Sequence, residues 1–392
     1  MDIAITGIGL TSGLGDGAEV HKQRISAGHH ALRPLKGLFG EDFPYANVHG
    51  AWIEDRSILM SRKWAPASML ALHVARQAVA DAGLGDAELS NAAVIVGSSR
   101  GNAAGWVSEW PQRRPVKLMA ASNSMHGELA SVVSIELGIR GPWQVIASGC
   151  AASLDALGMA WMMIRQGVVD RAIVIGVELP LIPEVLEAYE RTGVLAKGDI
   201  RDPYSPETSG LHPGEAGAAV VLESSDALKA RGMDARSKTR MTGYWCNSDA
   251  DSPIGMPDDG SGLRDCLRRA ISDLESEPAI TAICPHASGT LLHGKAELAA
   301  LRAALPDHAQ VSLHPLKPYT GHTVGANGIL DCALLTSFMG QGGLPPNIAG
   351  NTDPGPPFIM DAQALPSEET TVLKIAVGMG GHNSIVAFKS PL

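Results

Sequence analysis

Cys150, His286 and His322 combine reactive side chains with small neighbours, a combination that suggests nucleophilic chemistry. Cys150 follows a short apolar run at residues 144–147 and precedes apolar residues at helical spacing. We therefore expect it at a turn from a strand into a helix. Because the free N–H groups and the dipole of a helix start favour a thiolate, we expect a lowered pKa and a reactive sulfur. The alternative is a small buried apolar residue, as free cysteines commonly are.

The two histidines lie in separate segments that contain glycine and hydroxyl residues. His286 belongs to Pro-His-Ala-Ser-Gly-Thr at residues 285–290, and His322 closes Lys-Pro-Tyr-Thr-Gly-His at residues 317–322. A cysteine with distant histidines is typical of a nucleophile whose partners converge in the folded chain. Two imidazoles can also stabilise an oxyanion by N–H donation. No cysteine and histidine have the close spacing of a zinc site, so we expect no bound metal.

The five cysteines are scattered and odd in number, which fits neither a disulfide framework nor a metal site. We expect them to be reduced, and we expect iodoacetamide to modify Cys150 ahead of the other four. The formal net charge of −10 argues against non-specific binding to nucleic acid or to an anionic membrane. No apolar run reaches the roughly 18 residues of a membrane span, and residues 1–7 lack the pattern of a signal peptide. These features predict a cytoplasmic protein.

Strand-like apolar runs alternate with helical patterns along the chain, which predicts an α/β layered fold. The expected strands are residues 3–10, 92–97, 143–147, 171–177, 218–223, 240–245, 279–284, 310–313, 373–377 and 384–388. The expected helices are residues 65–82, 127–137, the segment after Cys150, 262–275, 296–305 and 325–339. Residues 100–115 and 340–357 have the composition of loops. A length of 392 residues suggests two core-forming units, or one large domain with a pseudo-repeat.

Six segments, taken in order, resemble a β-ketoacyl synthase of the Cys-His-His type, from the carbon–carbon bond-forming enzymes of fatty-acid and polyketide synthesis. They are residues 5–10 with 13–15, the Cys150 turn, Gly-Glu-Ala-Gly at 214–217, the His286 segment with 295–297, residues 317–322, and Gly-Met-Gly-Gly-His-Asn at 378–383. The resemblance implies a thiolase-like fold, with two pseudo-repeated βαβαβαββ halves in five layers. We expect residues 1–235 to hold Cys150 and residues 236–392 to hold both histidines, together forming one catalytic unit.

The resemblance implies a reaction in two parts, with no cofactor and no metal. An acyl group moves from a carrier thioester to Cys150, and a malonyl thioester on acyl carrier protein then loses CO₂ and attacks this acyl group. The backbone N–H groups of Cys150 and Met379 would hold the thioester oxyanion, beside Gly378 and Gly380.

The other implied residues serve the decarboxylation. His286 and His322 would donate hydrogen bonds to the oxygen of the malonyl-derived enolate. Lys317 would support this network, and we expect Glu297 to be its ionic partner. His293 and His382 have no counterpart in the family, so we interpret them as structural.

Some residues depart from the family pattern. Ala287 and Ser288 follow the first histidine where the family usually has Gly-Thr, and Gly294 replaces an acidic residue. Met379 stands where the family has a gating phenylalanine, and its flexible side chain would alter which acyl chains enter. These departures suggest a specialised enzyme rather than the housekeeping one.

We compare three alternatives that share this fold. A thiolase would carry a second reactive cysteine where Met379 stands, and a Cys-His-Asn starter synthase would have asparagine in place of His322. A non-catalytic, chain-length-factor-like subunit of a heterodimeric ketosynthase would generally lack the nucleophilic Cys150. The altered residues after His286 keep this last alternative open.

The expected partners are acyl carrier protein and a second ketosynthase chain. We expect a homodimer, with a heterodimer possible, paired through an edge strand at residues 143–147. An acidic carrier protein would need a local basic patch, because the net charge is negative. The candidate basic residues are Arg62, Lys63, Arg113, Arg114 and Arg165.

Overall fold

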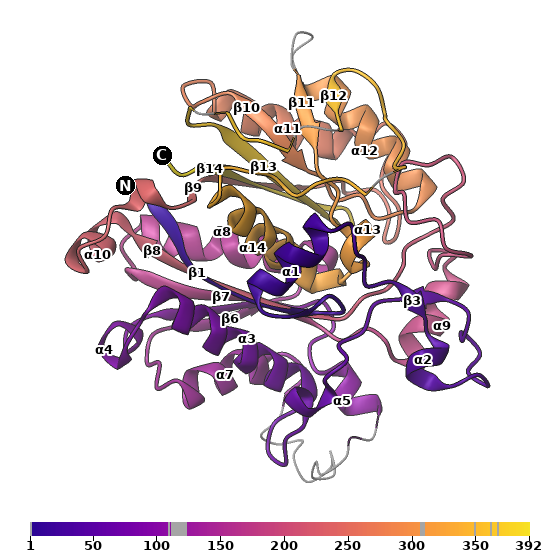
Figure 1. Ribbon diagram of the computed structural model, residues 1–392, viewed down its shortest axis with the longest axis horizontal. Helices are drawn as coiled ribbons and strands as arrows, with labels where there is room; N and C mark the ends of the chain where they lie inside the picture. The colour runs from indigo at the N-terminus through magenta and orange to yellow at the C-terminus, as the bar shows by residue number, and fades with distance from the viewer. Residues whose placement is uncertain are drawn as a thin grey trace.

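The computed structural model of the protein describes residues 2–108, 110, 124–305, 310–348, 350–360, 363–366 and 368–392. Through this part of the chain runs a 12-stranded mixed sheet. Figure 1 shows five layers: two outer layers of helices, two layers of strands, and a central layer of helices between the strands. The predicted α/β layered fold is confirmed.

Each half of the molecule contributes five main strands. The first half contributes β1 (Ile3–Ser12), β5 (Ala93–Gly97), β6 (Trp143–Ile146), β7 (Arg171–Glu178) and β8 (Ala216–Ser224). The second half contributes β9 (Arg240–Ser248), β10 (Ile280–Cys284), β11 (Val311–Leu313), β13 (Thr371–Gly378) and β14 (His382–Lys389). From the centre of the sheet outward, the strand order is β1, β8, β7, β5, β6 on one side and β9, β14, β13, β10, β11 on the other.

The two halves also share the direction of every strand contact. In each half the first two contacts from the centre are antiparallel and the next two are parallel. Strands β1 and β9 join the halves, with Ile3 opposite Met241. The predicted pseudo-repeat is therefore confirmed, whereas the division of the chain at residues 235 and 236 stays a prediction.

Three long helices belong to each half and complete the βαβαβαββ order. They are α3 (Pro66–Ala82), α7 (Gly127–Glu136) and α8 (Ala152–Arg165), then α11 (Ser261–Asp273), α12 (Leu291–Ala304) and α14 (Asn327–Met339). Helices α3 and α7 cover the outer face of the first half, and α11 and α12 cover that of the second. Helices α8 and α14 lie between the two layers of strands, where apolar residues of both halves form one shared core.

Local sequence signals explain several of these elements. Helix α3 begins with Pro66 at its first turn and ends at Gly83, which adopts a left-handed conformation with φ of 62°. Strand β5 is buried along its whole length, as expected for a parallel strand covered on both faces. Gly158 lets α8 approach the neighbouring strand, because a Cβ there would lie 2.3 Å from the ring of Tyr244.

Short elements complete the described chain. They are β2 (Gly15–Asp16), α1 (Ala18–Ser26), β3 (Arg33–Pro34), α2 (Lys36–Phe39), β4 (His49–Gly50), α4 (Asp86–Leu89), α5 (Ala103–Val107), α9 (Pro183–Arg191), α10 (Ser225–Ala230), α13 (Lys317–Thr320) and β12 (Phe358–Ile359). There are also 3₁₀ turns at Arg56–Leu59, Gly149–Ala151, Ala235–Ser237 and Val324–Ala326.

Two expectations about local structure are wrong. Helix α12 begins at Leu291, directly after its N-cap residue Thr290, rather than at residue 296. Helix α5 lies within residues 100–115, which were expected to form a loop; its small residue Ala104 packs into the outer core of the first half. Residues 109 and 111–123 lie outside the described residues.

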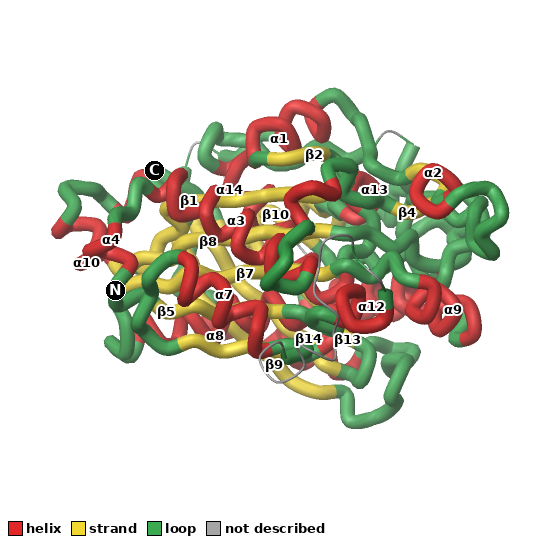
Figure 2. The backbone as a smooth tube through the Cα atoms, turned by 90° about the horizontal axis from the view of Figure 1, so that it is seen from below, coloured by secondary structure: helices red, strands yellow, loops and turns green. Residues whose placement is uncertain are grey.

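Helices α13 and α9 mark one end of the molecule. Figures 1 and 2 show α13, α9 and the surrounding loops at the end opposite the two termini. Strand β6 lies at one edge of the sheet, as predicted, and Trp143 on it is 46% exposed. In the described part of the chain, no helix has both the length and the apolar character needed to cross a bilayer.

Candidate active site

Cys150 lies in the 3₁₀ turn between β6 and α8, so the predicted strand-to-helix turn is confirmed. Gly149 permits this turn by adopting φ of 62°. Cys150 is only 5% exposed. Burial raises the pKa of the Cys150 thiol, although the charges of Arg100 and Lys317 act to lower it. The expectation of a lowered pKa is therefore wrong, because desolvation outweighs these favourable charges.

The other cysteines bear on access to this sulfur. Cys246 is exposed, whereas Cys150, Cys266, Cys284 and Cys332 are buried. Exposure alone therefore favours labelling of Cys246 on β9, and the preferred labelling of Cys150 stays a prediction. Selective labelling of Cys150 would have to come from its surroundings rather than from exposure.

The glycine-rich turn between β13 and β14 lies against the Cys150 turn. A Cβ on Gly378 would lie 2.8 Å from the carbonyl oxygen of Ser148 and 3.4 Å from the backbone nitrogen of Cys150. Gly380 adopts φ of 94°, which favours glycine. The backbone of Met379 also acts to lower the pKa of the Cys150 thiol, against the larger effect of burial. The two backbone groups predicted to bind an oxyanion are thus neighbours across this contact.

Glu297, on α12, holds the backbone of the loop that carries His286. The fully buried carboxylate accepts the N–H of His286 at 2.6 Å and the N–H of Ala287 at 2.9 Å. Ala287 has φ of 46°, a conformation that is unfavourable for a residue with a Cβ. Burial alone would raise the pKa of Glu297. His293 and these two N–H groups outweigh burial and hold that pKa below its ordinary value. An ionised Glu297 therefore fixes the loop in this conformation.

His322 follows α13 and is held by backbone contacts on both sides. Its N–H donates to the carbonyl of His212 at 2.6 Å, and its ring Nδ1 accepts the N–H of Val324 at 3.1 Å. In the neutral ring the proton therefore sits on Nε2. Burial and the nearby Lys317 hold the pKa values of His322 and His286 well below their ordinary range. Both rings are neutral at pH 7, and their centroids lie 5.2 Å apart.

Lys317 links the His286 loop to the Cys150 turn. Its buried ammonium donates to the carbonyl of His286 and lies 3.3 Å from Oδ1 of Asn327. Asn327 donates in turn to the carbonyl of Cys150 at 2.5 Å. Sequence reasoning missed Asn327, because an asparagine at a helix start is ordinarily read as part of the helix cap.

The expected ion pair between Lys317 and Glu297 is wrong. Among the residues that the structure describes, Lys317 forms its ion pair with Asp331, at 4.0 Å. Glu297 and Lys317 act on opposite sides of His286 instead, since the carboxylate accepts its N–H and the ammonium donates to its carbonyl. The two charged residues therefore cooperate through the backbone of one residue.

A cavity of about 400 Å³ is lined by Cys150, His286, His322, Gly378 and Met379. Lys317 and Glu297 lie behind it, and Gly380 follows Met379 in the turn. The rim of the cavity is apolar and solvent-exposed, formed by Ile254, Leu291, Leu292 and Met379. The structure thus brings together residues that lie in four separate segments of the sequence, while their catalytic roles stay predictions.

His293 and His382, which were interpreted as structural, have different positions. His293 lines the cavity, with its ring edge-to-face against His286 at 4.9 Å and its Nδ1 3.1 Å from the Met256 sulfur. His382 forms an ion pair with Asp155 at 2.7 Å, and this carboxylate raises the pKa of His382. His293 therefore belongs to the site by position.

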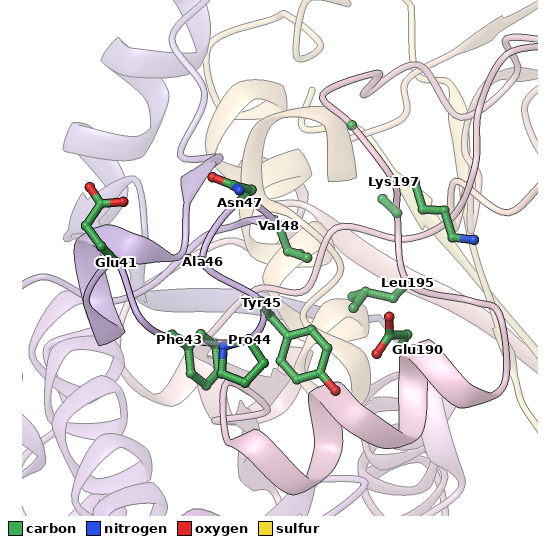
Figure 3. Close-up of a pocket in the computed structure, with 12 residues that line it drawn as sticks. Glu41, Phe43, Pro44, Tyr45, Ala46, Asn47, Val48, Glu190, Leu195 and Lys197 are labelled. Atoms are coloured by element: carbon green, nitrogen blue, oxygen red, sulfur yellow. The ribbon is translucent and has the colours of Figure 1, made fainter.

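A second cavity, of about 320 Å³, lies between the loop at residues 41–48 and the segment after α9. Figure 3 shows the ring of Tyr45 beside Glu190 and Leu195, below Val48 and Asn47. Within the described chain, neither Cys150 nor a histidine lines this cavity. Among the described residues, no group of three or more histidine, cysteine or acidic side chains is arranged to hold a metal ion.

Comparison with known proteins identifies the family. The family described as "Beta-ketoacyl synthase, N-terminal domain" matches residues 1–227, and the one described as "Beta-ketoacyl synthase, C-terminal domain" matches residues 239–351. Nodulation protein E of Rhizobium leguminosarum bv. trifolii is 29% identical, over 99% of this chain and 98% of that protein. The tetracenomycin polyketide synthase ketoacyl synthase alpha subunit of Streptomyces glaucescens is 27% identical, over 99% and 97%.

Solved structures share the fold. A type II PKS ketosynthase in complex with its acyl-carrier protein superposes with a TM-score of 0.82 at 22% identity, covering 99% of both chains. The ishigamide ketosynthase/chain length factor superposes with a TM-score of 0.80 at 24% identity, again covering 99% of both chains. The predicted thiolase-like fold is confirmed. With both family domains matched in order along it, the chain belongs to the β-ketoacyl synthase family and is an acyltransferase of the condensing-enzyme class.

Proposed function

We propose that the cavity catalyses a decarboxylative Claisen condensation, beginning with acyl transfer to Cys150. The sulfur attacks the carbonyl carbon of an acyl thioester, and the carrier thiol leaves with the proton that Cys150 loses. The oxygen of the tetrahedral intermediate is held by the N–H groups of Cys150 and Met379, which are preorganised donors. The apolar rim of the cavity suits the entry of an acyl chain.

In the second step, a malonyl thioester loses CO₂, and the electrons of the broken bond form an enolate. His286 and His322 donate hydrogen bonds to the enolate oxygen; the neutral rings and the Nε2 proton of His322 support this assignment. The enolate carbon attacks the thioester on Cys150, a carbon–carbon bond forms, and the sulfur leaves as the thiolate. The β-ketoacyl product remains on the carrier.

The observation that carries this proposal is the convergence of Cys150 and two neutral histidines on one cavity. Intact-mass analysis after exposure to an acyl-carrier thioester should show one acyl group added to the protein. The variant Cys150→Gln should show no added acyl group and no condensation, while it still decarboxylates a malonyl thioester. Condensation that persists in this variant would refute the proposal.

The second candidate is a chain-length-factor-like subunit that does not elongate. The substitutions after His286 favour it, but the presence of Cys150 in the cavity speaks against it. Such a subunit would remain unacylated in the intact-mass experiment and would raise the activity of a separate ketosynthase when the two are mixed.

We propose acyl carrier protein as the partner that delivers both thioesters, because one solved neighbour is a ketosynthase in complex with such a protein. The polyketide synthase relative favours a polyketide-type acyl group. Of the basic residues expected to contact the carrier, Arg62, Lys63 and Arg165 are exposed, whereas Arg113 and Arg114 lie outside the described residues. Charge reversal at Arg62 should weaken carrier binding, and more strongly at low salt.

We further propose a dimer paired through β6, whose outer edge lacks a neighbouring strand in the described sheet. A homodimer would be self-sufficient, and the ketosynthase/chain length factor neighbour makes a heterodimer the alternative. Light scattering of the purified chain should give the mass of two chains, and a stable monomer would favour the heterodimer. A cytoplasmic location stays a prediction from the sequence.

A further inference from the structure

Strand β13 begins with Thr371 and is otherwise apolar except for one charged residue, Lys374. Its side chain is 0% exposed. Strand alternation places it on the same face as Val372 and Ala376, which pack into the core shared by the two halves. A buried ammonium is strongly unfavourable unless it is paired, so the partners of Lys374 indicate why it is there.

Three acceptors surround the Lys374 ammonium. Oδ2 of Asp331, on α14, lies 2.5 Å from Nζ, the carbonyl oxygen of Pro285 lies at 3.1 Å, and the sulfur of Cys284 at 3.6 Å. Burial would lower the pKa of Lys374, but Asp331 holds it above the ordinary value. Lys374 is therefore a fixed positive charge directly behind the loop that begins at Pro285 and carries His286.

The same carboxylate oxygen also faces Lys317. The Nζ of Lys317 lies 4.0 Å from Oδ2 of Asp331, beyond direct hydrogen-bond distance. In the described part of the chain, neither lysine forms an ion pair with another carboxylate. Two ammonium groups thus share one carboxylate, and Lys374 holds the closer position. Lys317 instead donates to the carbonyl of His286.

We propose that Lys374 is a positioning residue for the decarboxylation step: its ammonium occupies Asp331, and this leaves Lys317 to hold the carbonyl of His286 and the amide of Asn327. This inference rests on the role proposed above for His286. Without Lys374, the buried Asp331 carboxylate would have Lys317 as its ionic partner. Closing that pair from 4.0 Å to an ordinary ion-pair distance of about 2.8 Å would draw Lys317 away from the His286 loop by about 1 Å.

The test begins with Lys374→Met, which removes the ammonium and replaces it with an unbranched apolar side chain of similar length. Lys317 is then the one lysine facing Asp331. Malonyl-thioester decarboxylation should fall by about tenfold to a hundredfold, the loss that a displacement of about 1 Å can cause. Acyl transfer to Cys150, followed by intact mass, should be unchanged. Lys389→Met is the matched control, since Lys389 lies on neighbouring β14 and pairs with Glu277 away from the cavity.

The pH dependence of decarboxylation is a second measurement, and it should not change if Lys374 only stabilises the fold. Lys317 is faced by Lys374, Asp331, Cys284 and Glu297, and burial with the charge of Lys374 lowers the pKa of Lys317 to about 8. Removing the charge of Lys374 removes a repulsion and strengthens the pair with Asp331. The alkaline limb of decarboxylation should therefore move to higher pH in Lys374→Met, and it should stay in place in Lys389→Met.

The double variant Lys374→Met/Asp331→Asn separates positioning from stability. It leaves no carboxylate to compete for Lys317, so decarboxylation should return toward the rate of the unmodified protein. If Lys374→Met does not fold, this double variant decides alone: recovery supports the proposal, and a folded but slow protein overturns it. A folded Lys374→Met with the unmodified rate and pH limb would also overturn it.

His286→Ala, assayed in parallel, distinguishes a failure of this inference from a failure of the proposed function. If decarboxylation survives His286→Ala, the role assigned to His286 is wrong and the premise is lost. If His286→Ala is impaired while Lys374→Met is not, only the role of Lys374 is wrong.

Discussion

Replacing Glu297 with glutamine tests whether one buried carboxylate holds the His286 loop. The carboxylate accepts the N–H groups of both His286 and Ala287 and is also 3.2 Å from the hydroxyl of Tyr204. The amide of glutamine offers one oxygen and turns an NH₂ group toward the second N–H. One buried backbone donor therefore loses its acceptor, at a cost of about 1 to 3 kcal/mol.

The expected change in melting temperature follows from the size of the chain. At about 2.1 cal/mol/K for each residue, 392 residues unfold with an entropy of about 0.8 kcal/mol/K. Glu297→Gln should thus lower the melting temperature by about 1 to 4 °C, measured by scanning calorimetry. Ala287, no longer held at φ of 46°, should relax and displace the ring of His286.

This displacement should affect one half-reaction only. Release of CO₂ from a malonyl thioester should fall by about tenfold or more in Glu297→Gln, because one enolate donor moves. Acylation of Cys150 should continue, since its backbone donors are untouched. Glu128→Gln is the matched control: Glu128 is a buried carboxylate that accepts the N–H of Ala65 at 2.6 Å, outside the cavity. The reasoning is refuted if Glu297→Gln and Glu128→Gln release CO₂ equally fast.

Three further predictions concern pH and close packing. Burial lowers the pKa of Lys317 to about 8, so the ammonium is lost as pH rises through that value; decarboxylation should decline above about pH 8 in a pH–rate profile. Burial lowers the pKa values of His21 and His314 from 6.5 to about 4. The stability that these neutral rings contribute is therefore present above pH 6.5 and is lost as pH falls toward 4. The melting temperature should decrease as pH is lowered from 6.5 to 4. Gly378→Ala would place a Cβ 2.8 Å from a backbone oxygen and push the two turns apart, so intact-mass analysis should show acylation slowed by about tenfold or more.

The proposed roles divide the site into two parts, one built from backbone N–H groups and the other from side chains. The acylation part rests on backbone N–H groups, which the contact between two glycine-containing turns brings together. The decarboxylation part rests on side chains, and its histidines are held by Glu297 and Lys317 through one stretch of backbone. Substitutions of these charged residues should therefore separate the two half-reactions, whereas substitutions in the turns should slow acylation.

The sequence by itself determined the alternation of strands and helices and the repeated order of elements. Both follow from local periodicity, with apolar runs of strand length and apolar residues at helical spacing. The turn at Cys150 was also predictable, because a small-residue step between a strand and a helix is encoded within a few residues. The segments of His286 and His322 were recognisable for the same reason, since their glycines and hydroxyl residues are adjacent in the chain.

Only the tertiary structure decided which charges meet. Lys317 was expected to pair with Glu297, yet the Glu297 carboxylate accepts the N–H of His286 while the Lys317 ammonium donates to its carbonyl. Asn327, Asp331 and Lys374 gave no sequence signal of a shared site, since α14 and β13 meet only in the folded core.

The pKa of Cys150 was likewise decided by the fold. A helix start lowers the pKa of a cysteine when water or a cation can stabilise the thiolate, and that local effect is readable from sequence. How much water the fold removes depends on the residues packed around the sulfur, which come from distant parts of the chain. At 5% exposure desolvation prevails, so the resting thiol has a raised pKa. Local pattern therefore determined the elements and the reactive residue types, whereas burial and charge pairing, which depend on long-range packing, came only with the folded chain.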